Sequence, residues 1–93
     1  MRAIVVDAAG KLMGTASSTH APFRAEHPGW AEQDPEDWWR AAQEAIRGAL
    51  AATPEPREPI AALALTGQMH GAVMLDKSGA VLRPSLIWCD TRT

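Results

Sequence analysis

An apolar run at residues 60–66 limits the choice of fold class more than any other part of this sequence. It reads Ile-Ala-Ala-Leu-Ala-Leu-Thr and lies between Pro59 and Gly67. The run has the length of a β-strand, and it is apolar on both faces as far as Thr66. Such runs are typical of strands covered on both sides in parallel sheets. The sequence therefore predicts a central strand at residues 60–66 in an α/β fold.

Two glycine-containing turns predict two β-hairpins. The first pairs residues 3–7 with 12–19, and the second pairs residues 72–75 with 80–82. One more short strand is expected at residues 85–88. Together with the central strand, these segments predict a mixed sheet.

One main helix is predicted from its capping residues. Asp34 can accept backbone N–H bonds as the N-cap, and Pro35 suits the first helical position. Apolar side chains recur at three- and four-residue spacing from Trp38 to Leu50, so the helix is amphipathic and extends to about residue 52. Residues 22–33 contain prolines and a glycine without periodicity and are interpreted as a connection.

Composition limits both the core and the partners. The chain has 93 residues, and 18 of its apolar residues are alanine, so 25 larger apolar side chains remain for a core. The net charge is −2 and the basic residues are scattered, which excludes a nucleic-acid-binding surface. No apolar run approaches the ~20 residues of a membrane span. The single cysteine, Cys89, fits a reducing compartment, so a cytoplasmic location is expected.

The turn at residues 67–71 is the first candidate site. It follows the predicted central strand, and ligands of α/β sheets bind beyond the carboxyl ends of strands. Gln68 and His70 supply donors and acceptors for a hydroxyl-rich ligand, and Gly67 and Gly71 permit close approach of the backbone. The alternative is a tight turn in which His70 only satisfies a neighbouring carbonyl.

The second candidate site is the pair Asp90 and Arg92. Two residues apart on extended backbone, their side chains project to the same side and can orient each other or a ligand. A surface ion pair that caps the strand is the alternative. Cys89 between the strand and this pair is interpreted as a small buried apolar residue.

Two further groups of residues have a functional and a structural interpretation. Three tryptophans can stack on sugars or anchor the core: Trp30, Trp38 and Trp39. Four acids can bind a metal or cap the helix: Glu32, Asp34, Glu36 and Asp37. Core anchoring with partial exposure is the simpler interpretation of the tryptophans, and helix capping is the simpler interpretation of the acids, so no metal site is predicted.

Two stretches resemble the N-terminal domain of the FGGY carbohydrate kinases. They are residues 28–39, which begin Pro-Gly-Trp, and residues 64–93, which contain Gly-Gln-Met-His-Gly and Trp-Cys-Asp-Thr-Arg. Within that family the Gln-Met-His-Gly turn is most similar to that of the xylulokinases. The resemblance implies that residues 1–93 are an incomplete N-terminal domain. It would be a partial ribonuclease-H-like domain of the actin-like ATPase fold, with one main helix, two β-hairpins and its first strand missing.

The resemblance also implies an activity and a set of site residues. The parent enzyme would phosphorylate a ketose with ATP and Mg²⁺, converting D-xylulose to D-xylulose 5-phosphate. Met69 and His70 would contact the sugar, and Gln68 and Gly71 would shape that turn. The cleft would be lined further by two residues of the Trp-x-Asp-x-Arg segment, Asp90 and Arg92.

Parts of the family pattern are absent from the sequence. The Asp-x-Gly-Thr phosphate loop and the catalytic aspartate of the family have no counterpart in these 93 residues. No catalytic residue is therefore assigned, and the chain alone is expected to be inactive. Its expected partners are a small sugar and the remainder of a kinase chain. The alternatives are a kinase for another sugar or polyol and a non-catalytic sugar-binding or interaction module.

Overall fold

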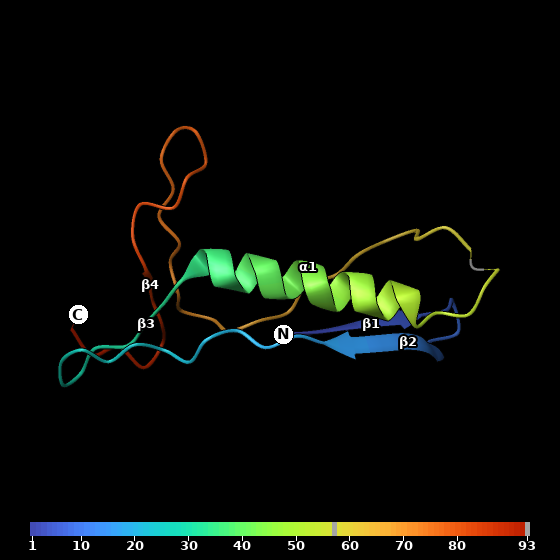
Figure 1. The fold of residues 1–93 in the computed structure, drawn as a ribbon, viewed down its shortest axis with the longest axis horizontal. Helices are drawn as coiled ribbons and strands as arrows, with labels where there is room; N and C mark the ends of the chain where they lie inside the picture. The colour runs from blue at the N-terminus through green and yellow to red at the C-terminus, as the bar shows by residue number, and fades with distance from the viewer. Residues whose placement is uncertain (57, 93) are drawn as a thin grey trace. The chain divides into compact units, whose positions relative to one another are not determined.

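The computed structural model describes residues 1–56 and 58–92 and contains one long helix and four strands. The strands are β1 (Arg2–Val6), β2 (Leu12–Ser17), β3 (Glu32–Gln33) and β4 (Ser85–Leu86), and the helix is α1 (Pro35–Ala51) (Figure 1). They belong to two compact units, Met1–His20 with Trp38–Ala64 and Ala21–Asp37 with Leu65–Thr93, called here the first and second unit. Within the described residues, the helix is not long and apolar enough to cross a membrane.

The first predicted hairpin is confirmed as β1 and β2, which pair antiparallel. Its turn is held by Asp7, whose Oδ1 accepts hydrogen bonds from the backbone N–H groups of Ala9 and Lys11, both at 2.9 Å. Gly10 adopts the left-handed φ of 81° that the turn requires. The register shifts between Val5 and Val6, and beyond this irregularity Ile4 lies opposite Thr15.

The predicted helix is confirmed as α1, and it begins at its predicted cap. Asp34 Oδ1 accepts a hydrogen bond from the Glu36 N–H at 3.0 Å. The most buried face, however, carries Ala41, Ala45 and Ala49, at 0–1% exposure. The spacing of apolar residues in the sequence did not identify Ala41 as a buried position, because the larger apolar side chains of the helix dominate that pattern.

Small residues let the hairpin approach α1 closely within the first unit. A Cβ added at Gly48 would lie 2.7 Å from the Ala16 Cβ, closer than real Cβ contacts. Gly48 costs the helix about 1 kcal/mol relative to alanine, so the close approach to β2 gives it a packing role. The helix ends at Ala51, and beyond it the Thr53 Oγ1 donates to the Ala49 carbonyl oxygen at 2.9 Å, which satisfies one of the last carbonyl groups.

The predicted central strand at residues 60–66 is wrong for this structure. Within the described residues no strand pairs with this segment, and all seven of its residues are exposed, with Leu65 at 86%. A central strand needs a hydrogen-bonded neighbour on both edges. β1 and β2 pair only with each other, so they supply none.

The second unit is built around β4, which has a neighbour on each edge. On one edge β3 pairs antiparallel with β4, placing Glu32 opposite Leu86, and on the other Ala72 forms a bridge to Leu86. Arg24 in turn bridges to Glu32. The interpretation of residues 22–33 as a plain connection is therefore wrong at Arg24 and at β3.

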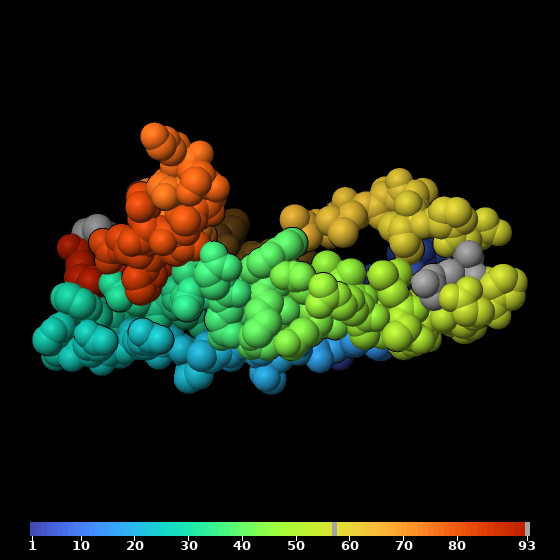
Figure 2. All heavy atoms as spheres, turned by 45° about the horizontal axis from the view of Figure 1, so that its top comes forward, coloured from blue at the N-terminus to red at the C-terminus, as the bar shows by residue number. Residues whose placement is uncertain are grey.

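The second predicted hairpin is formed by hydrogen bonds but with a single bridge, between Leu75 and Val81. Asp76 Oδ1 holds its turn by accepting from the backbone N–H groups of Ser78 at 2.8 Å and Ala80 at 2.9 Å. The hairpin projects from the rest of the second unit (orange in Figure 2). The strand predicted at residues 85–88 ends at Leu86, because a turn closed by the Asp90 N–H and the Ile87 carbonyl follows it.

Gly14 provides a test of the hairpin–helix contact. We expect Gly14→Ala to lower the free energy of unfolding by about 1–3 kcal/mol, since the added Cβ would lie 2.5 Å from Thr53 Oγ1. Urea unfolding followed by the helical circular dichroism signal measures the change. The control is Gly67→Ala, because a Cβ there meets no atom within 4 Å. Equal stability of the two variants would contradict the packing role of Gly14.

Candidate functional site

The predicted sugar-contacting residues Gln68, Met69, His70 and Gly71 lie together on an exposed turn of the second unit. Met69 is 73% exposed. His70 has a φ of 63°, a left-handed conformation that is uncommon for a residue other than glycine. The turn therefore presents an amide, a thioether and an imidazole to its surroundings, and these suit a ligand with both hydroxyl groups and apolar faces.

A buried hydroxyl holds the chain at the end of this turn. Ser85 is 1% exposed, and its Oγ donates to the Ala72 carbonyl oxygen at 3.0 Å. Ala72 follows Gly71 directly and bridges to Leu86. The turn is thus joined to β4 through both backbone and side-chain contacts.

The Asp90 carboxylate is the most extensively bonded acid of the site. Its side chain is 4% exposed, and Oδ2 accepts from the Ala31 N–H at 2.7 Å. The Arg92 guanidinium donates to both carboxylate oxygens, with Nη2 2.6 Å from Oδ2. The Arg92 hydrogen bond, with a smaller contribution from Ala31, holds the pKa of Asp90 well below its usual range. Asp90 is therefore ionised at neutral pH and poorly suited to accept a proton there.

Arg92 is held on three sides. Besides Asp90, its Nη2 donates to Glu32 Oε1 at 2.8 Å, and its guanidinium carbon lies 3.9 Å from the centre of the Trp30 ring. Such stacking on an indole adds a cation–π attraction. The hydrogen bond to Asp90, followed by the one to Glu32, raises the pKa of Arg92 above its usual value. The surface pair considered from the sequence is thus part of a larger, partly buried cluster.

Glu32 was not predicted as part of this cluster. Its Oε1 also accepts from Arg83 Nη2, at 2.9 Å. The hydrogen bond from Arg92 is the largest cause that lowers its pKa. The helix-capping interpretation is therefore wrong for Glu32, although it is confirmed for Asp34. No spacing rule reveals an acid that pairs with arginines 51 and 60 residues later.

Trp30 was considered for sugar stacking or core anchoring, and in the structure it packs against charged and aromatic neighbours. Arg92 covers its ring, and the His27 ring approaches it edge-on with centroids 4.6 Å apart. Trp39 on α1 is 60% exposed, as the interpretation of core anchoring with partial exposure allows.

The two candidate segments belong to the same unit and flank β4. The turn at residues 67–71 leads into Ala72 on one edge of β4, while Asp90 and Arg92 bond to Ala31 and Glu32 on the other. Their common support is β4.

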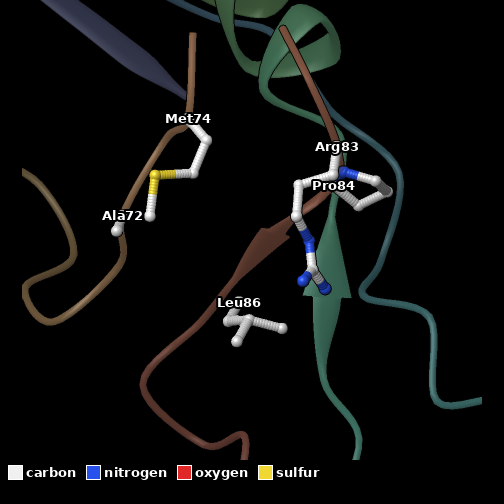
Figure 3. A pocket seen from close by; sticks show the side chains of 5 residues that line it. All are labelled: Ala72, Met74, Arg83, Pro84 and Leu86. Atoms are coloured by element: carbon white, nitrogen blue, oxygen red, sulfur yellow. The ribbon is translucent and has the colours of Figure 1, made fainter.

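The described residues hold no metal-binding cluster, and the pocket beside β4 is small. Residues 1–56 and 58–92 contain no group of three His, Cys, Asp or Glu side chains able to hold a metal ion. A pocket of about 80 Å³ is lined by Ala72, Met74, Arg83, Pro84 and Leu86. Figure 3 shows Met74 and Ala72 facing Arg83, Pro84 and Leu86 across it. Ligand pockets usually measure about 300–1,000 Å³, so this one is too small for ATP.

Comparison with known proteins decides the family. Residues 1–93 match the sequence model of the N-terminal domain of the FGGY family of carbohydrate kinases. The chain belongs to this family. The family uses ATP and a divalent metal in general.

Relatives of the chain are sugar and polyol kinases by name. It is 41% identical to a xylulose kinase of Klebsiella pneumoniae over 99% of the chain and 18% of the relative. It is 37% identical to a glycerol kinase of Paenarthrobacter aurescens (strain TC1) over the same shares. The crystal structure of a "xyloylose kinase" from Brucella ovis is 42% identical, with a TM-score of 0.88, over 98% of this chain and 19% of that one. The expected family and fold class are confirmed, and the chain spans about a fifth of the length of these kinases.

The charge of Asp90 makes the stability of the second unit depend on pH. Because its pKa is lowered on folding, Asp90 stabilises the fold above its unfolded value of 3.8, and this contribution is lost as the pH falls through the folded value. We expect Asp90→Asn to be less stable than the parent at neutral pH, since an amide N–H group would face the Arg92 donors. The difference should shrink below about pH 4.

Urea midpoints measured by tryptophan fluorescence between neutral and acid pH test this expectation. Glu26→Gln is the control, because Glu26 is an exposed acid of the same unit outside the cluster. A difference between Asp90→Asn and the parent that stays constant down to acid pH would contradict the role of the charge.

Proposed function

We propose that these 93 residues supply the sugar-contacting part of a kinase that phosphorylates a ketose, D-xylulose, to D-xylulose 5-phosphate. The observation that carries the proposal is the exposed turn with Gln68, Met69 and His70, in a chain of the FGGY family that is 41–42% identical to kinases named for xylulose or xyloylose. His70 would bond a sugar hydroxyl, Met69 would cover an apolar sugar face, and Gln68 and Gly71 would shape the turn. Asp90 and Arg92 would line the cleft.

The remaining chemistry belongs to other parts of a kinase in this proposal. Residues 1–93 would be an incomplete N-terminal domain, and the groups that hold ATP and Mg²⁺ would lie outside them. The carboxylate that accepts the proton of the attacking hydroxyl would also lie outside residues 1–93. A cytoplasmic location follows from the use of ATP and agrees with the single cysteine.

An activity assay of the purified 93-residue chain tests whether the groups that hold ATP and Mg²⁺ lie outside it. Incubated with ATP, Mg²⁺ and D-xylulose, it should produce no D-xylulose 5-phosphate above background. Turnover by the chain would show that it carries the missing groups itself. Saturable binding of D-xylulose without turnover would instead favour a sugar-binding module.

The sugar contact is tested in a working enzyme. In the grafted kinase, residues 1–93 replace the matching segment of the Brucella ovis kinase. We expect the graft to phosphorylate D-xylulose and His70→Gly to raise its KM for D-xylulose about 10-fold, the value of one lost hydrogen bond. Glycine keeps the left-handed backbone at this position, so the change removes only the imidazole.

Lys77→Ala is the control for that experiment, because Lys77 lies on the projecting hairpin. An unchanged KM in His70→Gly would remove His70 from the sugar site. The glycerol kinase relative supplies the second candidate substrate class, a polyol. A graft that phosphorylates glycerol but not D-xylulose would favour it.

A further inference from the structure

Glu32 joins the two ends of the segment that contains β4. Its Oε1 accepts from Arg83 Nη2 at 2.9 Å and from Arg92 Nη2 at 2.8 Å. Arg83 precedes β4 by two residues, and Arg92 follows it by six. Figure 3 shows the Arg83 side chain extending across β3, where Glu32 lies. A single carboxylate oxygen thus closes the segment 83–92 against β3.

Each end of this segment leads to one half of the candidate sugar site. On the Arg83 side, β4 begins with Ser85, whose hydroxyl donates to the Ala72 carbonyl at the end of the turn with His70. On the other side, Arg92 carries the bonds to Asp90 and stacks on Trp30. Glu32 is therefore bonded to supports of both halves.

The charges of the cluster also depend on Glu32. Two guanidinium groups, Arg83 and Arg92, lie against two carboxylates, Glu32 and Asp90. The Glu32 side chain is 16% exposed, so little water is available to replace it. Without Glu32, one excess positive charge would remain, and two hydrogen bonds would be lost at once.

We propose that Glu32 is a positioning residue for sugar recognition: it holds Arg92 against Trp30 and Asp90 and holds β4 behind the turn at residues 67–71. This inference rests on the proposed sugar-kinase function. Glu32 touches no substrate itself, so its effect should fall on the KM for the sugar rather than on the KM for ATP.

Substitutions in the grafted kinase test this role. We expect Glu32→Ala to raise the KM for D-xylulose about 10-fold while kcat and the KM for ATP change about twofold or less. Glu32→Gln should recover part of the loss, because its amide oxygen still accepts from both arginines although the negative charge is gone. Arg83→Gln should show a smaller increase, since the Arg92 bond remains. Glu26→Ala, the matched acid outside the cluster, should behave as the parent.

A purely structural role would give a different pattern. If Glu32→Ala lowers the melting temperature but leaves the KM for D-xylulose equal to that of Glu26→Ala, the positioning role is overturned. The same conclusion follows if the KM for ATP rises equally, or if Glu32→Gln shows no recovery.

Crystal structures of the graft and its Glu32→Ala form separate this inference from the proposed function. Displacement of the Arg92 guanidinium from the Trp30 ring in Glu32→Ala supports the positioning role, whether or not the graft uses D-xylulose. A graft that does not use D-xylulose contradicts only the proposed function. An Arg92 that stays on Trp30 in Glu32→Ala overturns the inference.

Discussion

One carboxylate oxygen of Glu32, shared between Arg83 and Arg92, closes the part of the chain on which the candidate site depends. β3 and β4 are each two residues long, and strands that short supply few backbone hydrogen bonds. Side-chain bonds to carboxylates are stronger than neutral ones, and here they supplement the backbone ladder. The second unit therefore owes much of its order to a polar cluster rather than to an apolar core.

The first unit has a small core that is built from small side chains. Its buried helix positions are Ala41, Ala45 and Ala49, and Gly48 lets β2 come within contact of the helix. Alanine loses no side-chain freedom on burial, but each contributes little apolar area. The larger apolar side chains on the outer face of the hairpin, Ile4 and Val6, remain at least half exposed. The hairpin and the helix of this unit therefore pack closely but bury little apolar area.

Features set by neighbouring residues could be predicted from the sequence, and features set by distant ones could not. The cap at Asp34 and the turn at Gly10 depend on residues within a few positions, so their signals are local. The apolar run at residues 60–66 carries a strand signal, but a strand also needs partners, which the sequence of the run does not specify. The spacing of Asp90 and Arg92 and the family resemblance both singled out this pair, but its bonds to Ala31 and Glu32 span 59 and 60 residues.

Each of the two units is assembled from two separate stretches of chain, and the helix α1 begins in one unit and ends in the other. During synthesis on the ribosome, residues 21–37 emerge well before the residues of β4 that pair with them. β3 can bridge to Arg24 early, but it lacks its β4 partner until residues 85–86 have left the exit tunnel, and the loop that must close is long. Neither unit can be excised as a continuous peptide, and a premature stop before β4 would leave the aromatic and charged residues 27–32 without a structure to join.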